Sequence, residues 1–240
     1  MSPFRLWVYL STTPLFWLTV TLLCWLVADD CARRSKRNPL VNPVLLAIVM
    51  VASLLYATGT DYQTYFNGAQ FVHFILGPAT VALGVPFYRN FGLVRRNVWP
   101  MLVALLGGSL TAIVSAVGIA MLMGVPQPVL VSIAPKSVTA GVAMAISQDL
   151  GGIPSLTAAM VMVTGVIGAV MVTPLFNALK IKDFAARGFA VGLASHGIGI
   201  ARALNVSPVA AVFAGIAMGM NALVTALILP AVLKALIGGH

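Results

Sequence analysis

Two short segments of this 240-residue sequence carry the side chains best suited to bind an anion. Lys136 follows a proline in the segment 134–139, and His196 follows a serine in the segment 194–197. Proline suits the first turn of a helix, and serine or threonine hydroxyls cap free N–H groups there. Each segment therefore predicts a helix N-terminus, with Ser195 as the N-cap of the second. Helix N-termini beside cationic side chains favour a negatively charged ligand, and a small carboxylate fits best.

Each of the two cations also has a structural explanation. Lys136 could extend its ammonium group to the membrane interface from a hairpin tip. Ionisable side chains inside membranes are costly and usually functional, which favours a binding role for this lysine. His196 is either a neutral packing residue or a group that titrates near physiological pH, as a carboxylate contact or a proton carrier.

The candidate substrate-binding set extends beyond these cations. It consists of Lys136, Ser137, Thr139, Ser195, His196, Gly197, Arg202 and Asn221. Arg202 lies near the expected end of its helix, where a cation also stabilises the dipole and could pair with Asp149. Asp149 is a surface residue, a structural partner or part of a coupling-ion site. Asn221 lies in the last apolar run, either in a cavity or as an amide that bridges helices.

The composition places these residues in a membrane protein. Of the 240 residues, 60% are apolar and 8% are charged, whereas soluble domains carry about 25% charged residues. Glutamate is absent and only five residues are aspartate, which leaves little material for carboxylate catalysis or an oxygen-rich metal site. The net charge of +9 is spread over short clusters and not along a basic helix face, so no nucleic-acid partner is expected. We expect no enzyme activity, no metal and no other cofactor.

Six apolar runs are predicted to span the membrane as helices. They are residues 6–28, 43–58, 69–86, 100–124, 153–176 and 209–233. A spanning helix needs about 20 mainly apolar residues, with a range of about 17–25. The second run is the shortest of the six and falls just below this range. Two further stretches, 126–152 and 187–207, are apolar but interrupted by turn-forming and polar residues.

The basic clusters indicate how the two interrupted stretches enter the membrane, because cytoplasmic loops collect Lys and Arg. The clusters are Arg33-Arg34-Lys36-Arg37, Arg89-Arg95-Arg96 and Lys180-Lys182-Arg187. If both stretches are re-entrant, all ten of these residues face the cytoplasm, and Arg5 and Lys234 face outside. A full crossing by 126–152 would leave seven basic residues inside against five outside. The re-entrant arrangement is favoured, with a discontinuous span as its competitor.

An internal repeat is visible in the second half of the chain. Ile133-Ala134-Pro135-Lys136-Ser137-Val138 aligns with Leu193-Ala194-Ser195-His196-Gly197-Ile198 at an offset of 60 residues. Each copy, 126–176 and 187–236, joins one hairpin to one span, so consecutive copies insert in opposite orientations. Chance similarity between small-residue helices is the alternative. An inverted repeat is typical of secondary transporters that bind substrate near the midplane.

The predicted fold is an all-α integral membrane protein with about six spanning helices and two re-entrant or broken helical hairpins. The hairpins form the inverted repeat of an elevator-like transporter. Residues 1–125 are expected to form a scaffold that holds the oligomer contact of a homodimer. Residues 126–240 are expected to form the transport unit.

The motifs of the second half resemble those of the LrgB/CidB family of bacterial membrane proteins, which are described as antiholin-like or holin-like. The matching segments are Pro135-Lys136-Ser137-Val138-Thr139, Gly151-Gly152-Ile153-Pro154-Ser155-Leu156-Thr157 and Ala194-Ser195-His196, continuing to Leu204. The resemblance covers roughly residues 126–236, and the first half matches only in hydropathy and length. Ile200 occupies a position that threonine often holds in the family, so a hydroxyl contact is missing there.

The resemblance implies two functions. One is transport of small monocarboxylates of the glycolate, glycerate, lactate or pyruvate class, because the plastid glycolate/glycerate translocator resembles an LrgA–LrgB fusion. The other is modulation of murein hydrolase export and cell lysis beside a small LrgA/CidA-like membrane protein. Both place the chain among the lipids of the bacterial cytoplasmic (inner) membrane. The cationic helix N-termini favour carboxylate transport.

Overall fold

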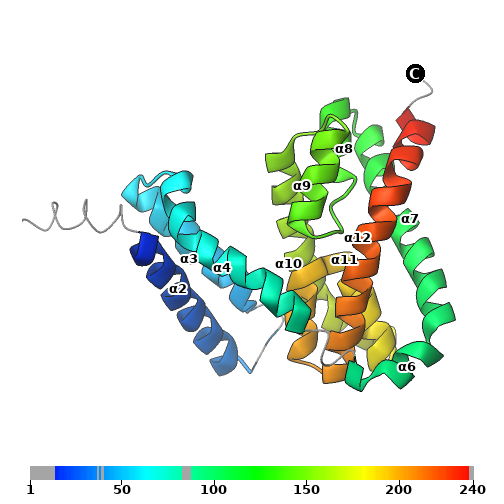
Figure 1. Ribbon diagram of the computed structural model, residues 1–240, viewed down its shortest axis with the longest axis horizontal. Helices are drawn as coiled ribbons and strands as arrows, with labels where there is room; N and C mark the ends of the chain where they lie inside the picture. Colours follow the sequence, from blue (N-terminus) through cyan, green and yellow to red (C-terminus); the bar gives the residue numbers. More distant parts are fainter. Residues whose placement is uncertain (1–13, 37, 39–40, 83–87, 238–240) are drawn as a thin grey trace, which may run out of the picture. The chain divides into compact units, whose positions relative to one another are not determined.

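A computed structural model describes the chain except for residues 1–13, 37, 39–40, 83–87 and 238–240. The described residues form helices joined by short turns and contain no strand (Figure 1). They divide into two compact units, residues 1–84 and 85–240.

The first unit consists of α2 (Pro14–Arg34), α3 (Pro43–Thr58) and α4 (Tyr62–Ala82). Trp17 of α2 is fully buried, and its ring meets the ring of Tyr65 of α4 edge-on, with centroids 5.8 Å apart. Such edge-to-face pairs add stability beyond the apolar area they bury. This aromatic contact joins α2 and α4.

Local signals set both ends of α3. The side chain of Asn42 accepts hydrogen bonds from the N–H groups of Val44 and Leu45, at 2.9 and 3.3 Å. Pro43 occupies the first helical position, where its missing N–H has no cost. Gly59 ends the helix in the left-handed conformation, with φ of 63°. The helix predicted over 43–58 is confirmed with the same bounds.

The second unit contains the other helices whose bounds the structure describes. These are α6 (Phe91–Arg96), α7 (Val98–Leu122), α8 (Gln127–Ile133), α9 (Ala140–Asp149), α10 (Pro154–Ala178), α11 (Phe184–Leu204) and α12 (Pro208–Ile237). α8 and α9 lie towards one end of this unit and α6 towards the other (Figure 1). Part of its core is a buried cluster in which Met101 and Leu105 of α7 pack with Phe189 of α11 and Phe213 of α12.

Four of the described helices, α2, α7, α10 and α12, are long and apolar enough to cross a membrane. They correspond to four of the six predicted spans. α3 is apolar but has 16 residues. The beginning of the first predicted span and the end of the third lie outside the described residues. A membrane protein built of helices is thus supported, while the six spans and the elevator-like arrangement stay predictions.

The first interrupted stretch forms a helical hairpin of α8 and α9. Ser132 near the end of α8 accepts a hydrogen bond from the N–H of Ile153, at 2.7 Å, which ties α8 to the start of α10. α9 begins at Ala140, later than the helix start predicted within 134–139. The N–H of Lys136 instead bonds to the carbonyl of Ile133, so the residues around Pro135 form a turn.

The second interrupted stretch, α11, also folds back on itself. Its helical conformation is broken at His196, with φ of 42° and ψ of −134°. A Cβ on Gly199 would lie 3.0 Å from Cγ2 of Val191. In a straight helix, residues eight positions apart are separated by about 12 Å along the axis, so the chain must turn back between these two residues. The break falls at His196, which takes the non-helical conformation. This is one residue after Ser195, the predicted N-cap.

The two hairpins reach the same level of α10 from its opposite ends. α9 leads directly into the beginning of α10, and α11 follows shortly after its end. At the first tip, Val138 packs with Val161 of α10 in a buried cluster. At the second tip, Nε2 of His196 lies 3.0 Å from the carbonyl oxygen of Val161. Two hairpins that enter in opposite directions are what an inverted repeat requires.

Gly188 and Gly192 let the first half of α11 pack directly on the backbone of α12. A Cβ on Gly192 would overlap the carbonyl group of Ala214, so Gly192→Ala should lower the free energy of unfolding by about 1–3 kcal/mol. Thermal unfolding in detergent measures this loss. Gly118→Ala in α7 is the matched control, because a Cβ there meets open space and alanine favours helix. Equal melting temperatures for the two variants would contradict the predicted packing.

Candidate functional site

A pocket of about 650 Å³, the central pocket, lies where the two hairpin tips meet α7 and α10. Its described lining is Gly107, Gly108, Thr111 and Ala112 of α7, Lys136 and Ser137 of the first tip, Thr164, Ile167 and Gly168 of α10, and Leu193, Ala194 and Ser195 of the second tip. The two segments singled out in the sequence, 60 residues apart, thus line one pocket. The fold brings them together because both tips end at the same level of α10.

Lys136 determines the charge of the central pocket. It is the only ionisable side chain among the described lining residues, and none of them is acidic. Its side chain is partly buried at the tip of the first hairpin. Electrostatic attraction is stronger in such surroundings than in bulk water. The pocket is therefore suited to an anion.

Ser195 supplies a hydroxyl group that has no hydrogen-bond partner within the described part of the chain. The residue is fully buried, and its side chain lies against Gly168 of α10, where a Cβ would overlap Oγ. A buried hydroxyl without a partner costs about 1–3 kcal/mol. A ligand oxygen that reached this hydroxyl would remove that cost by accepting its hydrogen bond.

Asn221 of α12 joins the two hairpin tips. Its amide nitrogen donates to the carbonyl oxygens of Ser137, at 3.2 Å, and Leu193, at 3.0 Å. Its amide oxygen accepts from the hydroxyls of Ser109, at 2.6 Å, and Thr225, at 3.2 Å. Both donors and both acceptor positions are used, which supports the bridging interpretation over direct contact with substrate.

His196 lies at the turn of the second hairpin and not in the described lining of the central pocket. It is buried, and its ring packs on Gly165, where a Cβ would lie 2.7 Å from Cε1. His196 has a positive φ, which is rare outside glycine and costs on the order of 1–3 kcal/mol. Residues with such strained backbone angles are often found at functional sites. On α10, Gly165 leaves room for the ring of His196 and Gly168 leaves room for the side chain of Ser195. Their three-residue spacing on one helix was the sequence signal for this contact, and it was missed.

The other predicted site residues are not among the described lining of the central pocket. Nη2 of Arg202 donates to Oγ1 of Thr173, at 2.9 Å, close to the end of α10. Asp149 is exposed at the end of α9, just before α10 begins, so the structure gives Arg202 a different contact from the predicted Asp149 pair. Thr139 precedes α9 and makes no side-chain cap bond among the described residues, and Gly197 is exposed. The substrate-binding roles themselves stay predictions.

The described residues hold no group of three or more His, Cys, Asp or Glu side chains that could bind a metal ion. The polar side-chain groups of the described lining are the ammonium of Lys136 and the hydroxyls of Thr111, Ser137, Thr164 and Ser195. These are hydrogen-bond donors for an anion. Carboxylate or imidazole ligands, which would suit a cation, are missing from the described lining.

Comparison with known proteins decides the family. The LrgB-like family model matches residues 21–235. The chain belongs to the LrgB-like family. The match confirms the resemblance predicted from the second half and extends it to residues 21–125, where the sequence motifs gave no signal beyond hydropathy.

This LrgB-like chain is similar to proteins named antiholin-like protein LrgB. The relative from Bacillus mycoides (strain KBAB4) is 28% identical over 220 residues, which cover 92% of this chain and 96% of the relative. The relatives from Bacillus cereus (strain B4264) and Bacillus anthracis (strain CDC 684 / NRRL 3495) have the same identity and coverage. No solved structure matches the LrgB-like chain.

Proposed function

We propose that this chain is an antiholin-like or holin-like modulator of murein hydrolase export and cell lysis. The observation that supports this function is the similarity to proteins named antiholin-like over 92% of the chain. The comparisons favour it more directly than they favour transport. In this role the chain acts in the bacterial cytoplasmic membrane beside a small LrgA/CidA-like membrane protein.

The central pocket supports a second candidate function, secondary transport of small monocarboxylates such as glycolate, glycerate, lactate or pyruvate. The observation in its favour is that Lys136 and Ser195, from two hairpin tips, line one pocket. The ammonium of Lys136 would neutralise the carboxylate, and Ser137 and Ser195 would donate hydrogen bonds to its oxygens.

Transport would also need a moving part. In this proposal residues 126–240 carry the substrate against a scaffold formed by residues 1–125 of a homodimer, with Asp149 as a candidate coupling-ion residue. α7, assigned to the scaffold, packs on α8, α11 and α12 within the second unit. Cross-links between the two parts that leave uptake intact would contradict elevator-like motion.

Reconstitution into proteoliposomes separates the two functions, with and without an LrgA/CidA-like partner. A carrier should take up labelled lactate or pyruvate saturably, with competition among carboxylates and no leakage of an encapsulated dye. A holin-like assembly should release the dye and show no competition. An antiholin should do neither alone but should suppress the dye release that a holin causes. If the protein shows none of these three activities, both proposed functions are wrong.

A further inference from the structure

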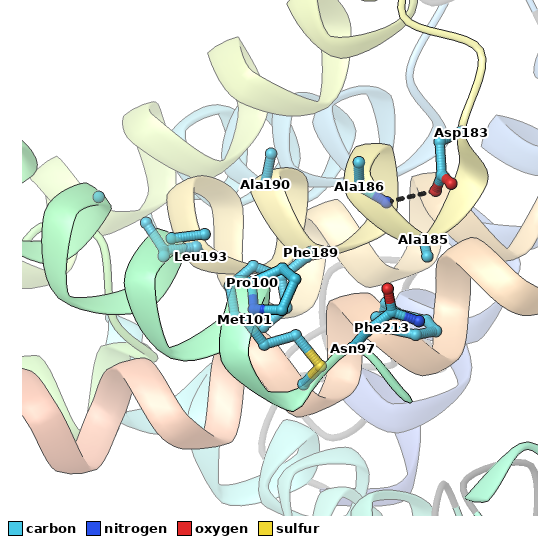
Figure 2. Close-up of a pocket in the computed structure, with 12 residues that line it drawn as sticks. Asn97, Pro100, Met101, Asp183, Ala185, Ala186, Phe189, Ala190, Leu193 and Phe213 are labelled. Atoms are coloured by element: carbon cyan, nitrogen blue, oxygen red, sulfur yellow. Dashed lines mark hydrogen bonds between the residues drawn. The ribbon is translucent and has the colours of Figure 1, made fainter. Parts of the chain in front are cut away.

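A second pocket, the inner pocket, adjoins the central pocket. It has a volume of about 320 Å³ and lies between α7, the first half of α11 and α12. Figure 2 shows Leu193 at one end of this pocket and Asn97 and Asp183 at the other, with Phe189 between them. The inner pocket therefore runs along α11, from its beginning towards the second hairpin tip.

The end of the inner pocket at Asn97 and Asp183 lies beside basic clusters of the sequence. Asn97 directly follows Arg95-Arg96, and Asp183 directly follows Lys182, inside the cluster Lys180-Lys182-Arg187. Basic loops mark the cytoplasmic side. Asp183 itself caps α11 by accepting a hydrogen bond from the N–H of Ala186, at 2.9 Å (Figure 2). This end of the inner pocket is thus assigned to the cytoplasm.

Leu193 and Gly108 line both pockets, and they are the described residues common to the two linings. The side chain of Leu193 is packed on Gly108: a Cβ at Gly108 would lie 3.1 and 3.2 Å from its two Cδ atoms. The leucine is 7% exposed. One isobutyl group on one glycine therefore occupies the boundary between the central and inner pockets.

The backbone of Leu193 is held in place, so a change at this boundary has to come from its side chain. Its carbonyl oxygen accepts a hydrogen bond from Asn221, at 3.0 Å, which anchors the end of the first half of α11. A change of the rotamer of this buried leucine requires its neighbours in the core cluster to give way but no movement of whole helices. A small solute could pass the boundary when this side chain swings away from Gly108.

We propose that the inner pocket is the cytoplasmic entrance to the central pocket and that Leu193, closed on Gly108, is the gate between them. The inference rests on the proposed transport function and adds to it a path and a gating residue. The solute it would admit is a small organic anion, because the path leads to Lys136. No movement of the hairpins is required for this step.

Cysteine accessibility tests the gate without measuring transport. The background is the full chain with Cys24→Ser and Cys31→Ser, in inverted membrane vesicles exposed to a membrane-impermeant methanethiosulfonate that carries a sulfonate. Ala190→Cys in the inner pocket should react readily. Ala112→Cys in the central pocket should react slowly, and its rate should rise about tenfold when Leu193→Ala is added, which corresponds to about 1.4 kcal/mol.

Leu105→Ala is the matched control. Leu105 is buried at 1% exposure in the same core cluster, and it belongs to neither described pocket lining. It should leave the rate at Ala112→Cys unchanged. The gate is overturned if Leu193→Ala does not raise that rate or if Leu105→Ala raises it equally. The entrance is overturned if Ala190→Cys does not react from the cytoplasmic side.

Failure of the gate and failure of transport are distinguishable. Labelling rates report access to the pockets whether or not any substrate moves. The expected labelling pattern with no saturable carboxylate uptake would refute transport and keep the gated path. Saturable uptake with equal labelling in the Leu193→Ala and parent proteins would keep transport and refute the gate.

Discussion

Asn221→Leu is expected to destabilise the second unit by about 2–4 kcal/mol, because hydrogen bonds between membrane helices average about 0.6 kcal/mol and orphaned buried groups add to the loss. The substitution removes a buried amide whose four hydrogen bonds reach Ser109, Ser137, Leu193 and Thr225. Two carbonyls at the hairpin tips and two hydroxyls would lose this partner. Thermal unfolding in detergent, followed by tryptophan fluorescence, measures the change.

Two further variants separate the bridging role of Asn221 from simple loss of packing. Thr225→Val keeps the shape of the side chain and removes one of the four bonds, so it should cost less than half as much. Asn221→Asp keeps the acceptor oxygen but has no amide donors for the two tip carbonyls, so it should also be destabilised. If Asn221→Leu melts at the parent temperature, the amide does not hold the tips together.

The parts of the fold that follow from local sequence could be predicted closely. Asn42 and Gly59 enclose α3 with a side-chain cap and a left-handed turn, and both signals act within four residues of the helix ends. The two tip segments were likewise recognised from polar residues that interrupt apolar runs. They meet in one pocket because the two hairpins reach α10 from its opposite ends.

The break in α11 could not be placed to the residue, because its cause is tertiary. Gly197 is the residue that local preference selects for positive φ, yet His196 takes this conformation. The carbonyl of Val161 lies 35 residues away in sequence and contacts the imidazole, and Gly165 leaves room for the ring. These contacts outweigh the local preference, so the predicted cap at Ser195 was one residue early.

The partners of Asn221 could not be predicted from the sequence, which left its role open between a cavity residue and an amide that bridges helices. Its partners Ser109, Ser137 and Leu193 lie 112, 84 and 28 residues away, and hydropathy does not align helices at that precision. Arg202 shows the same limit, since its contact with Thr173 spans 29 residues. Residue type placed both side chains in the candidate substrate set, and the fold shows their contacts: Asn221 joins the two tips, and Arg202 meets Thr173 near the end of α11.

Lys136→Ala is expected to lower the kcat/KM for carboxylate uptake by about 10- to 100-fold, since a hydrogen bond to a charged group is worth about 1.5–3 kcal/mol. Lys136 is the only ionisable residue in the described lining of the central pocket, so no described neighbour replaces its charge. Initial rates of labelled lactate or pyruvate uptake in proteoliposomes measure the effect. Lys136→Arg keeps the charge and should retain part of the activity.

Lys182→Ala is the control for Lys136, because it removes an exposed lysine from a basic loop and leaves the central pocket unchanged. Its uptake should equal that of the parent protein. The pair also separates the two proposed functions. A lysis modulator that acts by assembly has no need of a charge in the central pocket, so Lys136→Ala and Lys182→Ala should then alter lysis alike. A loss of carboxylate uptake in Lys136→Ala but not in Lys182→Ala would indicate that the anion binds the ammonium group of Lys136.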